Sequence, residues 1–189
     1  MGFPDLYLMR HGQTEWNAAG RMQGHQDSPL TVLGRQQAAR QADIMAPILA
    51  TGQQVARISS PLGRAVQTAE IVFAGQDFTT DARFREISVG EFEGRTRGDI
   101  EAAYPDLFAN TWLGWYDRAP GGETLNDLRV RVTEALSELT GPTAIVCHGI
   151  TLRMARLVVL GWPDTRLEEM EVRQGAVHLM RDGRHEMLV

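Results

Sequence analysis

Two histidine-glycine pairs are the residues of this chain best placed for chemistry. Arg10 and the pair His11-Gly12 follow the apolar run 6–9, and the pair His148-Gly149 follows the apolar run 144–147. A neutral imidazole can act as a nucleophile or a proton carrier, and an arginine beside it can bind an anion. A lone histidine is more often structural, but two such pairs at the ends of two predicted strands indicate one shared site.

Arg64 and Glu86 complete a set suited to phosphate chemistry. Arg64 falls near the start of a predicted helix, where the helix dipole disfavours a cation by about 0.3–1 kcal/mol. An anion bound at that helix end would turn the repulsion into a binding site. Glu86 follows the β-like stretch 78–80 and supplies a carboxyl group.

Phosphate monoester cleavage requires a nucleophile, cations around the non-bridging oxygens and an acid for the leaving group. The expected roles are His11 as the nucleophile, Glu86 as the acid and then the base for water, and a phosphate clamp formed by Arg10, Arg64 and His148.

The hydrophobic pattern predicts the elements that position these residues. The runs 6–9, 55–58 and 144–147 predict buried strands, and Asp182-Gly183 predicts a C-terminal hairpin. Helices are expected at about 31–49, 61–73, 125–139 and 151–160, the second with Ser60 as its N-cap.

Strands that alternate with helices predict an α/β fold, a three-layer α/β/α sandwich with a mainly parallel sheet. Ligands of such sheets bind beyond the carboxyl ends of the strands. We expect a single domain over residues 1–189, with a small cap or loop insertion at about 90–122. Its Trp112, Trp115 and Tyr116 could shape a substrate pocket or pack the cap.

Composition narrows the function classes. All 19 Lys+Arg residues are arginines, so a Walker loop and Schiff-base chemistry, which need lysine, are excluded. A net charge of -5 argues against nucleic-acid and membrane partners. The lack of a signal-like start and the single Cys147 favour a cytoplasmic protein. No cofactor and no metal are expected.

The segment 8–17, LMRHGQTEWN, resembles the opening signature of the histidine phosphatase superfamily, which has a phosphoglycerate-mutase-like fold. Further matches follow in order at 23–31, 60–69, 86–94, 120–123 and 146–149. The resemblance implies the same catalytic roles for His11, Glu86, Arg10, Arg64 and His148, and adds phosphate contacts from Asn17, Gln23, Gly24 and Gly149.

The resemblance favours the phosphatase branch, acting on a small phosphorylated metabolite. The true mutases carry an Arg-His-Tyr-Gly stretch after the acidic residue, and this chain has Ile87-Ser88-Val89-Gly90 instead. A mutase remains the first alternative, because a second phosphate site could be built from Arg21, Arg95, Arg97 and Arg118. The oligomeric state is left open, and a homodimer is compatible with the sequence.

Three other interpretations compete with this one. Cys147 and Arg153 have the spacing of a cysteine-dependent phosphatase loop, but its internal glycine is displaced. A metal could be bound by His11, His148 and Glu86, although two arginines beside it would repel a cation. A catalytically silent phosphate-binding or scaffold protein would keep the fold without turnover.

Overall fold

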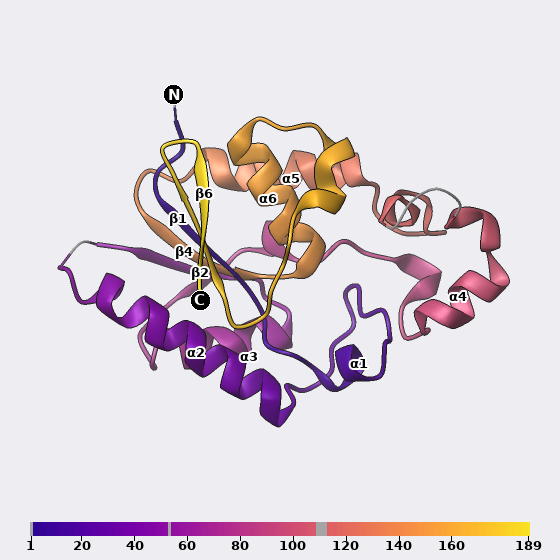
Figure 1. The fold of residues 1–189 in the computed structure, drawn as a ribbon, viewed down its shortest axis with the longest axis horizontal. Helices are drawn as coiled ribbons and strands as arrows, with labels where there is room; N and C mark the ends of the chain where they lie inside the picture. Colours follow the sequence, from indigo (N-terminus) through magenta and orange to yellow (C-terminus); the bar gives the residue numbers. More distant parts are fainter. Residues whose placement is uncertain (1, 53, 109–112) are drawn as a thin grey trace.

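The computed structural model describes residues 2–52, 54–108 and 113–189, and its centre is one mixed six-stranded sheet (Figure 1). The strand order is β3-β2-β4-β1-β5-β6. The strands are β1 (Leu6–Arg10), β2 (Ala56–Ser59), β3 (Thr79–Thr80), β4 (Thr143–Cys147), β5 (Val177–Arg181) and β6 (Arg184–Leu188). The pairings from β3 through β2 and β4 to β1 are parallel, whereas β5 is antiparallel to both of its neighbours. The expected mainly parallel α/β sheet is confirmed.

The register between β1 and β4 brings the two histidine-glycine pairs to one place. Arg10 lies opposite Cys147, and the backbone N–H of His11 donates to the carbonyl of Cys147 over 3.0 Å. Since the two strands are parallel, the segments that follow them leave the sheet at the same edge. His11 and His148 therefore emerge side by side.

Alternation along the strands builds a hydrophobic core on each face of the sheet. In β1, Leu6 and Leu8 belong to one buried cluster, and Tyr7 and Met9 belong to the other. The helices α2 (Val32–Leu49) and α3 (Gly63–Val72) cover the Tyr7 face, and α5 (Leu125–Ser137) and α6 (Gly149–Leu160) cover the Leu6 face (Figure 1). These layers form the expected three-layer sandwich.

The observed helix boundaries correct the sequence prediction at α3. This helix begins at Gly63, and its first N–H groups are capped by the Asp27 carboxylate, which accepts from Gly63 N at 2.6 Å and from Arg64 N at 3.2 Å. Ser60 is therefore not the N-cap, because Asp27, brought in from a distant loop, replaces it. α6 begins two residues earlier than predicted, at Gly149.

Shorter elements complete the chain. α1 spans Glu15–Ala18 and α4 spans Arg97–Ala103, and 3-10 helices are formed by Ala82–Phe84, Gly90–Phe92, Pro105–Leu107, Gly114–Arg118 and Asp164–Glu169. The predicted hairpin is confirmed at Asp182 and Gly183, which have φ angles of 50° and 69°. No helix within the described ranges is long and apolar enough to cross a membrane.

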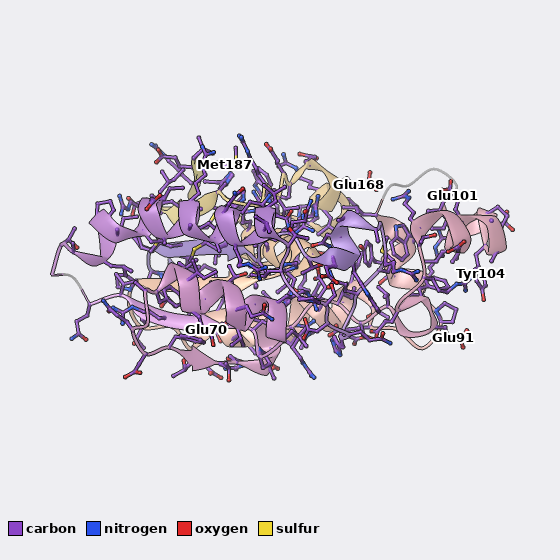
Figure 2. All side chains as sticks on the ribbon, turned by 90° about the horizontal axis from the view of Figure 1, so that it is seen from below. Glu70, Glu91, Glu101, Tyr104, Glu168 and Met187 are labelled. Atoms are coloured by element: carbon purple, nitrogen blue, oxygen red, sulfur yellow. The ribbon has the colours of Figure 1, made fainter. Side chains whose placement is uncertain are left out.

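The segment predicted as a cap lies at one end of the molecule. Both views place α4 there, with Glu101 and Tyr104 at this end (Figures 1 and 2). Phe92, Ile100 and Trp115 are buried in the same cluster as Leu6. The segment is thereby packed onto the main core. Trp112 falls outside the described residues.

Two glycines allow the loop after β1 to approach α2 closely. A Cβ atom at Gly34 would lie 2.0 Å from the carbonyl oxygen of Gln13, and one at Gly12 would lie 2.1 Å from the carbonyl oxygen of Gly34. Both distances are far below van der Waals contact with backbone atoms. This backbone packing fixes the loop that carries His11.

We therefore predict that Gly34→Ala lowers the free energy of unfolding by about 1–3 kcal/mol, as overpacking does in other proteins. The control is Gly98→Ala in α4, where the added methyl group would meet only Thr96 Oγ1 at 3.9 Å. Denaturant unfolding of both variants measures the difference. Equal stability of the two variants would contradict the close approach.

Candidate active site

The buried residues at the carboxyl ends of β1, β2 and β4 converge on His11. The ring centroids of His11 and His148 are 5.2 Å apart, and the Arg64 Nε donates to His11 Nε2 over 3.3 Å. All three side chains are at most 2% exposed. The predicted convergence of His11, His148 and Arg64 is therefore observed.

The hydrogen bonds of His11 define its tautomer. Its Nδ1 lies 2.7 Å from the carbonyl oxygen of Gly12, which can only accept, so Nδ1 carries the proton. Nε2 then keeps its lone pair, which accepts from Arg64. An imidazole held in this way presents Nε2 as a nucleophile.

The surroundings of His11 keep the imidazole neutral. Burial is the largest cause that lowers its pKa well below the usual value of 6.5, followed by the charges of Arg64 and Arg10. The pKa of His148 is lowered in the same way, by burial first and then by Arg64. A neutral, unprotonated Nε2 is the reactive form for attack on phosphorus.

Arg64 is held rigidly by the loop 24–27. Its guanidinium donates to the carbonyl oxygens of Gly24 at 2.8 Å and Gln26 at 2.7 Å, and it forms an ion pair of 2.8 Å with Asp27. These bonds fix the plane of the guanidinium and aim Nε at His11. Arg64 can therefore bind an anion with little reorganisation.

Two buried nitrogen atoms beside His11 have no hydrogen-bond partner among the described residues. These are Arg10 Nε and His148 Nδ1. Ser60 Oγ lies 2.7 Å from the Nε2 of His148. If the hydroxyl donates to that nitrogen, Nδ1 carries the ring proton. Unsatisfied buried donors are costly, and a phosphate oxygen would satisfy them.

Glu86 is fixed by the first N–H groups of α6. Its Oε1 accepts from the backbone N–H of Thr151 at 3.1 Å and from the Thr151 hydroxyl at 3.1 Å, and Oε2 accepts from the Ile150 N–H at 3.2 Å. A Cβ atom on Gly149 would lie 3.6 Å from both Glu86 Oε2 and Arg10 Nε. Oε2 therefore lies on the side of Arg10, with fewer donors than Oε1.

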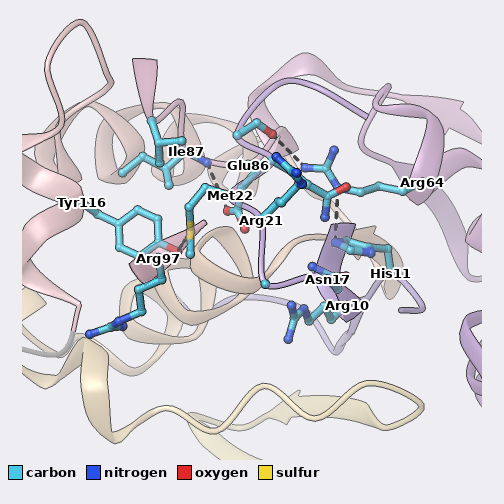
Figure 3. Close-up of a pocket in the computed structure, with 14 residues that line it drawn as sticks. Arg10, His11, Asn17, Arg21, Met22, Arg64, Glu86, Ile87, Arg97 and Tyr116 are labelled. Carbon is cyan, nitrogen blue, oxygen red and sulfur yellow. Dashed lines mark hydrogen bonds between the residues drawn. The ribbon is translucent and has the colours of Figure 1, made fainter. Parts of the chain in front are cut away.

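Three of the four remaining predicted residues line a cavity of about 300 Å³ that Arg10, His11, Arg64 and Glu86 also line (Figure 3). Asn17, Gln23 and Gly24 line it. Asn17 Oδ1 accepts from Thr14 N, which leaves its NH₂ group as the donor. Gly149 is not a lining residue but lies behind Arg10 and Glu86.

Part of the cavity lining is apolar. Met22, Ile87, Val89 and Tyr116 form it, and Figure 3 shows Ile87 and Tyr116 across the cavity from Arg64 and His11. Burial and the nearby Glu86 raise the pKa of Tyr116, so its hydroxyl stays protonated. Tyr116 thus shapes the pocket, whereas Trp115 packs in the core and stacks on it at 3.9 Å.

Several supporting residues were not predicted from the sequence. Gln174 donates to the His11 carbonyl at 3.1 Å, and His25 Nε2 donates to the Glu86 carbonyl at 2.9 Å. Arg131 also donates to this carbonyl, at 3.1 Å. They come from distant loops and from α5, so no local spacing signals them.

The structure opposes the cysteine mechanism. Cys147 is 1% exposed within the hydrophobic core, and burial raises the pKa of its thiol to about 12. A thiolate nucleophile needs a lowered pKa and access to substrate. As to metals, no three His, Cys, Asp or Glu side chains in the described part of the chain form a group that could hold an ion.

Fold and site together define a class of protein. Residues 6–187 match the histidine phosphatase superfamily (branch 1), and the chain belongs to this family.

Relatives of both kinds, mutases and phosphatases, are similar to it. A probable phosphoglycerate mutase, GpmB, of Salmonella paratyphi C is 38% identical over 173 residues, covering 86% of this chain and 79% of the relative. The solved structure of Bacillus stearothermophilus YhfR has a TM-score of 0.82 at 34% identity, covering 98% and 96% of the two chains. A mycobacterial glucosyl-3-phosphoglycerate phosphatase, solved with VO3, has a TM-score of 0.83 at 26% identity, with 98% of each chain covered.

The lowered pKa of His11 predicts its titration. At pH 6.5, where an ordinary histidine is half protonated, His11 should be neutral with the proton on Nδ1, and it should gain a second proton only well below that pH. Nitrogen NMR of the imidazole measures this directly. Arg64→Gln removes one positive charge and should move the titration to higher pH. Half-protonation of wild-type His11 near pH 6.5 would contradict the described electrostatics.

Proposed function

We propose that this protein is a phosphomonoester hydrolase that acts on a small phosphorylated metabolite through a covalent phosphohistidine on His11. The observation that carries the proposal is the neutral His11, with its Nε2 lone pair beside Arg64 and its Nδ1–H bonded to Gly12. The unpartnered nitrogen atoms Arg10 Nε and His148 Nδ1 support a phosphate site at the same place, with His148 Nδ1 as a donor when Ser60 donates to Nε2. Membership of the histidine phosphatase superfamily agrees with this chemistry.

In the first step, phosphate oxygens replace His11 as the acceptor of the Arg64 Nε–H. The freed lone pair of His11 Nε2 forms a bond to phosphorus as the bond from phosphorus to the leaving oxygen breaks. Glu86 gives a proton to that oxygen, so that an alcohol departs. Arg10 and Arg64 balance the charge on the non-bridging oxygens, and the Gly12 carbonyl stabilises the positive charge that develops on the imidazole.

In the second step, Glu86 acts as the base. It takes a proton from a water molecule whose oxygen attacks phosphorus, and the N–P bond breaks with its electron pair returning to Nε2. Inorganic phosphate leaves, and both Glu86 and His11 regain their starting states. Asn17 and Gln23 would orient the phosphoryl group throughout, since both line the cavity.

The alternative function is that of a phosphoglycerate mutase, and two specific observations support it. Arg21 and Arg97 also line the cavity, and a relative that is 38% identical is named a probable phosphoglycerate mutase. A mutase must hold a bisphosphate and exclude water from the phosphohistidine. The apolar Ile87 and Val89 on the cavity wall favour a phosphatase, because they give no charge for a second phosphate.

The nucleophile is tested by two substitutions in one assay. His11→Ala should remove essentially all hydrolysis of nitrophenyl phosphate, because the proposed mechanism forms the bond to phosphorus through His11 Nε2. Cys147→Ser should keep nearly all of it, with a loss of stability only, because this thiol is buried in the core. An active His11→Ala together with an inactive Cys147→Ser would overturn the assignment.

The acceptor of the phosphoryl group is tested separately. Purified protein receives 3-phosphoglycerate with catalytic 2,3-bisphosphoglycerate, and both 2-phosphoglycerate and free phosphate are followed. We expect a panel of phosphorylated metabolites to contain a substrate whose phosphate release is faster than this isomerisation. Isomerisation faster than phosphate release from every panel substrate would favour the mutase.

A further inference from the structure

We infer that Arg131, paired with Glu123, is a positioning residue that sets the location of the Glu86 carboxyl group. The inference rests on the proposed function, in which Glu86 is the proton donor. It assigns to α5 a part in catalysis, although neither side chain of the pair lines the cavity.

Glu86 depends on outside support because its segment has no regular structure. It lies between the 3-10 helices Ala82–Phe84 and Gly90–Phe92, outside any ladder of backbone hydrogen bonds. The α6 N–H groups hold its carboxylate, but they do not fix the backbone from which the side chain extends. Three side chains hold that backbone. The Thr151 hydroxyl donates to the Arg85 carbonyl at 2.7 Å, His25 Nε2 donates to the Glu86 carbonyl at 2.9 Å, and Arg131 donates to both carbonyls.

Arg131 binds this backbone on both sides of the Glu86 α-carbon. Its Nη1 donates to the carbonyl oxygens of Arg83 and Arg85, the latter at 2.8 Å, and its Nη2 donates to the carbonyl of Glu86 at 3.1 Å. Two carbonyl groups that flank the Glu86 α-carbon, and one in the preceding 3-10 helix, thus accept from a single guanidinium. The planar fork of arginine can reach all three, whereas the single ammonium of lysine cannot.

Glu123 orients the guanidinium and binds the other end of the segment. It accepts from Arg131 Nε at 2.5 Å and Nη2 at 2.8 Å. Its backbone N–H donates to the Ser88 carbonyl at 3.0 Å, and its Oε2 accepts from the Ser88 N–H at 3.4 Å. The pair therefore spans the segment from Arg83 to Ser88, with Glu86 in the middle.

The Arg131–Glu123 ion pair is mostly shielded from solvent, and its loss would shift the backbone at Glu86. Arg131 and Glu123 are 17% and 18% exposed, so solvent screens them less than a surface ion pair. Removing the guanidinium would take one donor from each of three carbonyl groups, leaving Thr151 on Arg85 and His25 on Glu86, and would leave the Glu123 carboxylate without its cation. A displacement of about 1 Å in a catalytic group can cost about 10²-fold in rate.

The predicted effect is selective for the leaving group. Arg131→Gln should lower kcat/KM for an alkyl phosphate by up to about 10²-fold more than for nitrophenyl phosphate, because an activated phenoxide departs without a proton. This parameter reports the steps up to the departure of the alcohol. Arg131→Lys keeps the charge but loses the fork, so its selective loss should be intermediate.

Arg129→Gln is the matched control. Arg129 also lies on α5, pairs with Asp164 at 2.5 Å and donates to the Trp162 carbonyl at 2.8 Å, but it makes no bond to residues 83–88 that the structure describes. Its loss should lower stability and leave the ratio between the two substrates unchanged. All rates are compared at a temperature where each variant is folded by circular dichroism.

Glu86→Gln, measured in parallel, separates two kinds of failure. If Glu86→Gln shows the selective loss and Arg131→Gln does not differ from Arg129→Gln, the positioning role is wrong while the acid role stands. If Glu86→Gln lowers both substrates equally, Glu86 is not the acid and the proposed mechanism fails. A selective loss in both Glu86→Gln and Arg131→Gln, with an unchanged ratio in Arg129→Gln, supports the inference.

Discussion

The parallel pairing of β1 with β4 is the constraint on which the site depends. Arg10, the last residue of β1, lies opposite Cys147, the last residue of β4. The residue after each strand is a histidine, and both imidazoles lie at the same edge of the sheet. A shift of one residue would turn each side chain to the opposite face of the sheet. The apolar alternation that fills two cores therefore also sets the distance between His11 and His148.

Around these histidines the chain places two arginines, Arg10 and Arg64, beside the cavity. Burial lowers the pKa of His11 most, and the charges of Arg64 and Arg10 lower it further. Asp27 pairs with Arg64, and Glu86 lies near Arg10. Arg10 Nε still lacks a hydrogen-bond partner among the described residues, and an anion bound there would supply one. The same charges that suppress protonation of the nucleophile are placed to bind a phosphate. The charges of Arg10 and Arg64 thus contribute both to phosphate binding and, after burial, to keeping His11 neutral.

The sequence predicted the helices, the strands and the residues of the candidate site better than the residues that hold that site in place. Strand patterns and the Asp182-Gly183 turn are local signals, and they identified the sheet correctly. The predicted start of α3 was wrong. Asp27, which is far from α3 in the sequence, supplies the cap that Ser60 was expected to provide. The sequence pattern did not identify Arg131 as a support of Glu86 either, because the backbone carbonyl groups that it binds lie more than forty residues away. Such contacts follow from the tertiary fold.

The central claim is that phosphoryl transfer passes through Nε2 of His11. Rapid quenching during turnover, followed by NMR of the isolated phosphopeptide, determines which nitrogen carries phosphorus. Because Nδ1 is bonded to the Gly12 carbonyl and Nε2 faces Arg64, the account predicts phosphorus on Nε2 alone. Phosphorus on Nδ1, or on a residue other than His11, would contradict it.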